Sequence, residues 1–306
     1  MSSKTISNLL TTTTLALAFT ACSSDADLQT PDQTTSEPKE IRLFSQVAGP
    51  ATRAVDNAAD LQDTQLANGT KITVKVKENA TPTTVDYALA TYTADGSGGL
   101  SLPAGVKQYY PASGNGVNIY AFHPMGVAQT FEVKTDQTTD ANYKASDLMW
   151  ASLSNITAAS TPAQRTLAFD HLLSKIVVTL VNTAGITDDA LATATVTLGN
   201  DNLVTSGTFT ASTGTFTPAS SGTGTITLAT NAGAATYAAI VVPQTASGKK
   251  INVKIGDQTS NYTISTATFE AGKRYTYVLT VGISGTLSLL KAEITDWQNV
   301  QIIKSM

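Results

Sequence analysis

Short runs of alternating apolar and polar residues recur along the chain from Glu40 onward, and residues that favour turns separate them. Ile41, Leu43 and Val47 share one face of the first predicted strand, an alternation typical of half-buried strands. Many short strands separated by Gly, Asn and Asp predict an all-β sandwich or barrel. Further strands are predicted at 72–76, 117–122, 175–181, 192–198, 225–228, 237–242, 251–255, 275–281 and 287–303.

One stretch, residues 158–173, has a weak helical pattern, but it is rich in Thr and Ser, so we interpret its end as the start of a strand. Phe169, Leu173 and Ile176 are predicted core residues there. In the strand that follows, the residues predicted to face inward are Ile176, Val178 and Leu180, and those on the other face are Val177, Thr179 and Val181. The 306 residues, 42% of them hydrophobic, suffice for two ordinary domains. The polar segment around Thr161-Pro162 is the predicted boundary between them.

The N-terminus is typical of an export signal. A single early positive charge, Lys4, precedes a short apolar stretch that ends in Thr20-Ala21-Cys22. This arrangement resembles the bacterial lipobox, in which the signal, here residues 1–21, is cleaved before a cysteine that is then acylated. Cys22 is the only cysteine, so the chain contains no internal disulfide. The alternative is an ordinary secretory signal with an incidental cysteine.

A polar tether follows Cys22. Residues 23–39 contain two prolines and several Ser, Thr and Asp, too little apolar surface to fold. No later run approaches the roughly 18 apolar residues that a membrane-spanning helix requires. A lipid on Cys22 would therefore be the only attachment to the membrane.

Charge and composition exclude several classes of function. The net charge is −4, and the 19 basic residues are scattered among 23 acidic ones, so no basic stripe suits nucleic acid. No pair of cysteines and no His/Glu cluster has the spacing of a metal site. No glycine-rich loop opens a helix, so no cofactor is predicted.

Catalytic residues are also not evident. Asp170 and His171 are neighbours on a predicted strand, so their side chains point to opposite faces and cannot form the pair of a catalytic triad. The two histidines, His123 and His171, are interpreted as structural. Trp150, Trp297 and the cluster Tyr109-Tyr110 could stack on a sugar, although aromatic residues on strands usually belong to the core.

Several segments, in order, resemble the fimbrillins, the subunits of type V pili of Gram-negative anaerobes. Each segment is short, but together they cover nearly all of the chain after the tether. The matching segments are Thr52-Arg53-Ala54, Ile119-Tyr120-Ala121-Phe122-His123-Pro124, Asp136-Gln137, Ser146-Asp147-Leu148-Met149-Trp150-Ala151, Leu167-Ala168-Phe169-Asp170-His171-Leu172-Leu173-Ser174-Lys175-Ile176, Val241-Val242-Pro243-Gln244 and Phe269-Glu270-Ala271-Gly272-Lys273-Arg274-Tyr275-Thr276-Tyr277.

The resemblance implies two transthyretin-like β-sandwich domains, at 54–162 and 163–306, after a signal at 1–21 and a tether with a removable strand at 22–53. It also implies a lipoprotein precursor that assembles on the outer membrane after an arginine-specific protease cuts between Arg53 and Ala54. Removal of a strand would open an apolar groove for a strand of a neighbouring subunit. Without the resemblance, Arg53 is equally well a loop arginine behind a permanent strand.

The C-terminal run contains the candidate donor strand, although an ordinary last strand of the second domain explains it equally well. The predicted function is a fimbrial subunit, not an enzyme, that polymerises with other pilin subunits at the cell surface and supports adhesion to a host or bacterial receptor. The alternative is a monomeric surface lipoprotein that binds a glycan or another ligand. Leu290, Ala292 and Ile294 share one face of the predicted donor strand, and Val300 and Ile302 continue it as apolar positions after Trp297.

Overall fold

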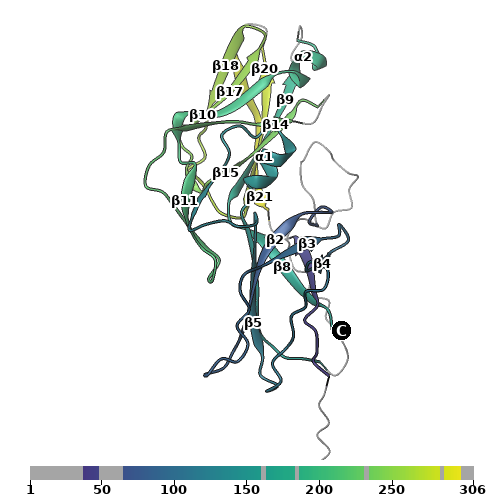
Figure 1. Ribbon diagram of the computed structural model, residues 1–306. Helices are drawn as coiled ribbons and strands as arrows, with labels where there is room; N and C mark the ends of the chain where they lie inside the picture. Colours follow the sequence, from purple (N-terminus) through teal and green to yellow (C-terminus); the bar gives the residue numbers. More distant parts are fainter. Residues whose placement is uncertain are drawn as a thin grey trace, which may run out of the picture. The chain divides into compact units, whose positions relative to one another are not determined.

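The computed structural model describes residues 37–47, 65–159, 163–182, 186–230, 234–282 and 286–297 (Figure 1). All of its helices and strands belong to one unit, Pro38–Met306. Strands account for 53% of the structure and helices for 5%, so the predicted all-β class is confirmed. The predicted domain boundary near residues 161–162 lies outside the described residues and stays a prediction.

Seven strands of the first half form one sheet that closes on itself, in the order β1-β4-β3-β2-β5-β7-β8. Alternate residues of several of its strands fill its interior; Ile72, Val74 and Val76 of β2, for example, are fully buried. The alternation pattern does not distinguish such a closed sheet from the two-sheet sandwich of the sequence analysis. The strands are β1 (Leu43–Val47), β2 (Lys71–Glu78), β3 (Ala90–Ala94), β4 (Gly99–Ser101), β5 (Val117–His123), β7 (Met149–Ile156) and β8 (Arg165–His171).

The second half contains a five-stranded sheet in the order β14-β15-β9-β20-β21 and a four-stranded sheet in the order β13-β10-β17-β18. Their apolar residues form a second hydrophobic cluster, separate from that of the closed sheet. The strands are β9 (Ser174–Asn182), β10 (Thr195–Leu203), β13 (Gly224–Thr227), β14 (Ala229–Thr230), β15 (Thr236–Val241), β17 (Lys250–Ile255), β18 (Gln258–Thr263), β20 (Lys273–Val281) and β21 (Leu287–Asp296) (Figure 1).

β9 lies between β15 and β20 and supplies much of this second cluster. Ile176 is fully buried, as predicted, and so are Phe169 and Leu173 just before it. Val177 is buried as well, because both faces of the first half of β9 are covered, whereas Val181 near its end is 36% exposed.

The two halves of the chain share a small three-stranded sheet in which β6 (Thr130–Glu132) pairs with β11 (Ser206–Thr210), and β11 pairs with β12 (Thr215–Pro218). Phe122 packs edge-to-face on Phe209, with ring centroids 5.5 Å apart. A two-stranded sheet, β16 (Gln244–Thr245) with β19 (Thr268–Phe269), completes the strands.

Two short helices were not predicted from the sequence. Thr139 caps α1 (Asp140–Ala145) and Thr187 caps α2 (Asp188–Ala192), each by accepting a hydrogen bond from a backbone N–H of the first turn. α2 explains why the strand predicted at 192–198 begins only at Thr195. Both helices are too short for helical periodicity to be visible in the sequence.

Candidate functional site

β1 fills the position between β4 and β8 and thereby closes the sheet of the first half. It runs antiparallel to β4, with Leu43 opposite Leu100, and parallel to β8, with Val47 opposite Phe169. A sheet that lost β1 would expose two strand edges with unpaired backbone N–H and C=O groups. A strand that replaced β1 would therefore meet the edges of β4 and β8 and an apolar interior at this position.

Alternate side chains of β1 point into this interior. Leu43 is 1% exposed and Val47 3% exposed, and Ile41, just before the strand, is 4% exposed. The prediction that these three share one buried face is confirmed. Each buried aliphatic side chain contributes roughly 1.5–3 kcal/mol, so the interior side chains are a major part of what holds β1.

The remaining inward position of β1 is Ser45, whose small side chain is 5% exposed. The backbone N–H of Ser45 donates to the carbonyl oxygen of Gly98 at 2.6 Å, and its hydroxyl donates to the same oxygen at 3.3 Å. Gly98 has a φ of +102°, and a Cβ on it would lie 3.2 Å from the Ser45 carbonyl oxygen. On the other side, Ser45 lies opposite Leu167, which is fully buried. A small side chain here leaves room for Leu167 in the interior.

The chain just before β1 pairs with a second segment, residues 108–110. The N–H of Ile41 donates to the carbonyl oxygen of Gln108 at 2.8 Å, and the N–H of Tyr110 donates to that of Lys39 at 2.9 Å. The side-chain oxygen of Gln108 accepts a hydrogen bond from the buried Tyr92 hydroxyl at 3.0 Å. This segment therefore extends the wall of the β1 position beyond β4.

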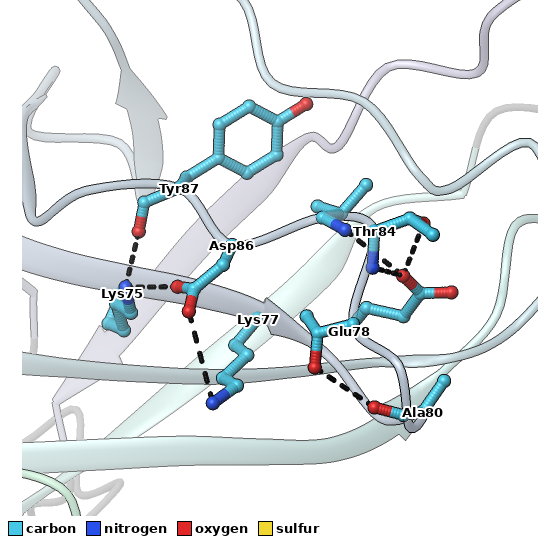
Figure 2. Close-up of polar contacts among 9 residues, drawn as sticks. Lys75, Lys77, Glu78, Ala80, Thr84, Asp86 and Tyr87 are labelled. Carbon is cyan, nitrogen blue, oxygen red and sulfur yellow. Dashed lines mark hydrogen bonds and ion pairs between the residues drawn. The ribbon is translucent and has the colours of Figure 1, made fainter.

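A polar network around Tyr87 holds the segment in place, and Figure 2 shows the part of it that joins Lys75, Asp86 and Tyr87. The Tyr87 hydroxyl accepts from the N–H of Tyr109 at 2.8 Å and donates to its carbonyl oxygen at 3.2 Å. Lys75 donates to the carbonyl oxygen of Tyr87 at 2.6 Å and pairs with the carboxylate of Asp86. The hydrogen bond from Lys75 lowers the pKa of Asp86. Tyr87 is thus fixed at its backbone while its hydroxyl supports the wall.

Glu78, at the end of β2, connects two loops of the same region and is 2% exposed. Its carboxylate accepts hydrogen bonds from the N–H of Thr84 at 2.6 Å, from the N–H of Val85 at 3.0 Å, and from Ser113 and Asn115 at 2.8 Å each. Figure 2 shows Thr84 meeting this carboxylate. These hydrogen bonds, led by that of the Thr84 side chain, lower the pKa of Glu78 to about 2. The ionised group is therefore a fixed support for both loops.

The last described strand, β21, has the opposite character to β1. It pairs only with β20 among the described residues and lies at the end of its sheet. Leu290 is 63% exposed and Ile294 is 56% exposed, and every residue of the strand except the half-buried Leu287 is exposed. Ala292 and Ile294 lie opposite the buried Tyr277 and Tyr275 of β20, so they face the side of the core yet remain uncovered.

One buried side chain, Trp297, fixes the end of β21. Its ring, 2% exposed, stacks on the imidazole of His171 with the ring centroids 3.8 Å apart and the planes 6° apart. The ammonium nitrogen of Lys175 lies 5.9 Å from the Trp297 ring centroid. The backbone N–H of Trp297 donates to the carbonyl oxygen of Gly272 at 2.7 Å. The imidazole is oriented by Asp147, 2.8 Å from its Nδ1.

The histidines have structural roles here. His171 does not pair with its neighbour Asp170, which is exposed, but with Asp147, a residue distant in sequence. Nδ1 of His123 lies 3.0 Å from the backbone carbonyl oxygen of Asp147, and burial lowers the pKa of His123. Sequence reasoning missed the Asp147–His171 pair, because only the tertiary fold brings the residues together.

The structure describes part of the predicted site. Leu290, Ala292 and Ile294 lie on β21, as predicted for a strand. Cys22, Arg53 and Ala54 lie outside the described residues, as do Val300 and Ile302. The walls of the β1 position were not predicted from the sequence, and the only signal for them was the glycine-rich turn before β4. These walls include Gly98, Leu100 and Leu167.

Sites for other chemistry are not evident in the part of the chain that the structure describes. Its His, Cys, Asp and Glu residues form no group of three or more that could hold a metal ion. None of its helices is long and apolar enough to cross a membrane. Trp150, a candidate sugar platform, packs beneath the β11–β12 hairpin, where its Nε1–H donates to the carbonyl oxygen of Ala211 at 2.7 Å.

Solved structures share this fold. A candidate cell adhesion protein from Bacteroides uniformis matches with a TM-score of 0.66 and 20% sequence identity, over 87% of this chain and 100% of that one. A second such protein, from Bacteroides ovatus, matches with a TM-score of 0.64 and 20% identity, over 85% and 98% of the chains. A fimbrial protein from Bacteroides ovatus matches with a TM-score of 0.51 and 17% identity, over 81% of this chain and 50% of that one. No curated protein matches the sequence.

The fold is thus that of an all-β class found among fimbrial and adhesion proteins of Bacteroides. The profile of the fimbrillin-like family matches residues 52–297, most of the chain, and the protein belongs to this family. The family is one of fimbrial structural and adhesion proteins and is not enzymatic. Membership implies a place at the cell surface, in a fimbrium assembled with other fimbrial subunits.

Proposed function

We propose that this protein is a fimbrial subunit that polymerises by strand exchange. A protease first cuts the chain after Arg53, and this cut makes β1 removable. The observation that carries the proposal is the position of β1, which closes the sheet between β4 and β8 with its alternate side chains buried. Arg53 follows β1 in the sequence and precedes β2. A cut there separates β1 from the rest of the sheet while leaving all other strands of the sheet on one chain.

The uncut chain resists exchange because β1 is tethered next to its own position. A tethered strand has a high effective concentration that a strand of another subunit cannot match. After the cut, β1 is held by non-covalent contacts alone, so it can leave the sheet and diffuse away. An incoming strand then gains backbone hydrogen bonds on both sides and buries its alternate side chains in one step.

β21 supports the second part of the proposal, that the C-terminal strand is the donor. It lies at an edge, carries the apolar residues Leu290 and Ile294 in solvent, and is paired on one side among the described residues. Its own side chains are mostly exposed, so its detachment would chiefly have to break its pairing with β20 and release the buried Trp297. Val300 and Ile302 would extend the donated segment.

Cys22 is proposed as the lipid attachment that holds the uncut precursor on the outer membrane, with the following tether lifting the folded unit from the surface. The cysteine is unique, follows a small residue after an apolar stretch, and precedes a polar segment. Cys22→Ala should abolish labelling of the protein by a fatty-acid probe. Labelling of that variant would refute the assignment.

The test of assembly is a gel of protein treated with an arginine-specific protease. The wild-type chain should form a ladder of SDS-resistant polymers after cleavage, and Arg53→Ala should remain monomeric under the same treatment. Arg42→Ala is the matched control, because Arg42 is exposed and precedes β1, and it should polymerise as the wild type does. An Arg53→Ala chain that polymerised with its N-terminal segment attached would refute the gating of assembly by the cut.

The same gel separates this proposal from that of a monomeric surface lipoprotein that binds a glycan, which predicts no ladder. The two tryptophans predicted as candidates for such a platform have other contacts. Trp150 is covered by the β11–β12 hairpin, and Trp297 is buried against His171. These contacts favour the assembly function. A host or bacterial receptor remains part of the proposal, as the target of the assembled fimbrium.

A further inference from the structure

The buried pattern of β1 recurs in the exposed strand β21. Within β1, residues 43–47 place a leucine, a small residue and a β-branched residue on alternate positions. Within β21, residues 290–294 repeat the same sizes in the same order. The two sets are Leu43, Ser45 and Val47 in β1, and Leu290, Ala292 and Ile294 in β21.

The two sets differ in exposure. Leu43 and Val47 are 1% and 3% exposed, whereas Leu290 and Ile294 are 63% and 56% exposed. Burial of the second set in the interior that holds the first would therefore remove two large apolar side chains from water. This gain is available only where a sheet lacks its own β1.

We propose that residues 290–294 of one subunit enter the β1 position of the next in one register, in which Leu290 takes the place of Leu43, Ala292 that of Ser45 and Ile294 that of Val47. This inference rests on the proposed strand exchange and adds the register and the residues that select the donor. Residues 290–294 then run antiparallel to β4 and parallel to β8, as β1 does.

The position of Ser45 sets the register. Ser45 is 5% exposed, and Leu167, its partner on β8, is fully buried. A larger side chain at this position would add volume to a buried interior, which destabilises packing, so the position favours a small one. Ala292 meets this requirement. Its lack of a hydroxyl leaves no group unpaired, because the backbone N–H at this position still donates to the Gly98 carbonyl oxygen.

Charge supports the same register. Phe44 of β1 lies opposite Gly99, and a carboxylate oxygen of Asp95 occupies the place where a side chain on Gly99 would begin. Lys291 takes the place of Phe44 and would face this carboxylate. Glu293 takes the place of Gln46, which is exposed to solvent. The register thus puts a cation beside an anion and leaves the second charge in water.

One position fits less well. Ser288 takes the place of Ile41, which is 4% exposed, so a small polar side chain would occupy an apolar position. The donor therefore underfills this end of the β1 position. This mismatch makes a gain of function testable, because Ser288→Ile should fill it.

The first experiment measures the register by disulfide trapping. The chain from Ser23 to Met306 contains the whole unit Pro38–Met306 and no cysteine. A Leu290→Cys chain and a Leu100→Cys chain are mixed, cut with the arginine-specific protease and oxidised. Residues directly opposite on antiparallel strands lie about 4.5–5.5 Å apart between Cα atoms, within the range of a disulfide. A disulfide-linked dimer of the two chains is expected.

Two controls define the result. Leu43→Cys with Leu100→Cys in one uncut chain should form the disulfide internally, since these residues are opposite in the structure. Leu289→Cys should cross-link with Leu100→Cys less than one-tenth as well, because it is shifted by one residue and faces the other way. Equal or better cross-linking of Leu289→Cys, within SDS-resistant polymers, would overturn the register and leave strand exchange intact. Absence of polymers from the cut wild type would instead refute the proposed function.

The second experiment tests the size selection. Ala292→Leu should abolish the ladder, whereas Ala292→Ser should retain it. Both substitutions lie on an exposed strand, so the thermal unfolding of the uncut chain should not change. Ser288→Ile should slow disassembly of polymers about tenfold or more, because it buries one further aliphatic side chain. Normal polymers from Ala292→Leu would overturn the inference.

Discussion

The substitution Leu43→Ala isolates the hold of the sheet on β1. Leu43 is 1% exposed and lies opposite Leu100 on β4 and Arg165 on β8, so truncation leaves a cavity in the interior. Leucine-to-alanine changes at such sites cost about 2–5 kcal/mol. A cost of about 3 kcal/mol lowers the melting temperature of a domain of this size by about 6–12 °C. Gln46→Ala, at an exposed position of the same strand, should change stability by less than about 0.5 kcal/mol.

The same substitution should act with the opposite sign on assembly. Once the chain is cut after Arg53, a loss of about 3 kcal/mol weakens the hold on the β1 segment by about 150-fold. Leu43→Ala should therefore polymerise faster than the wild type after cleavage, although the uncut variant is less stable. Calorimetry of the uncut chain and timed gels of the cut chain measure the two effects. Equal melting temperatures for Leu43→Ala and Gln46→Ala, or slower ladders from cut Leu43→Ala, would refute the reasoning.

Three further predictions concern the folded unit itself. Ile176→Ala, at a fully buried position, should lower the free energy of unfolding by about 2–5 kcal/mol in urea titrations, and Val181→Ala, on the exposed end of β9, by less than about 0.5 kcal/mol. The pKa of Glu78 is lowered from 4.5 to about 2, so the stabilisation of the fold by its carboxylate is complete above pH 4.5 and is lost as the pH falls toward 2. The melting temperature of Glu78→Gln should therefore fall less over this pH range than that of the wild type. In a Trp150→Phe chain, Trp297 is the only tryptophan, and His171→Leu should raise its fluorescence by removing the stacked imidazole, whereas unchanged emission would contradict the stack in solution.

Alternation predicted much of the fold, because a strand with one buried face records that face at every second residue. The runs at 117–122, 237–242 and 251–255 correspond to β5, β15 and β17. The helices α1 and α2 were missed, because a helix of one or two turns held by a threonine cap leaves no periodic signal. Burial on both faces of the start of β9 was also missed, since it depends on what packs against that strand.

Both strands of the candidate site were predicted from the sequence, but the difference in their exposure to solvent was not. Ile41, Leu43 and Val47 were identified as a strand with a buried face, and Leu290, Ala292 and Ile294 as apolar positions of a last strand. The residues of the first strand are buried and those of the last are exposed. This difference was not evident from the sequence, because both strands have the same alternation of apolar and polar residues. Exposure depends on the neighbours that the fold supplies, and no local pattern encodes it.

By itself, the sequence determined the local properties of this protein: the all-β class, the alternation of its strands, the polar tether and the order of the family's segments. These follow from side-chain chemistry at short range. Only the tertiary structure decided that β1 lies between β4 and β8, that Ser45 lies opposite the buried Leu167, and that Trp297 stacks on the His171 imidazole, which Asp147 orients. These contacts join residues far apart in the chain, and pairing between strands is set by packing and register across the whole sheet, which no single segment specifies.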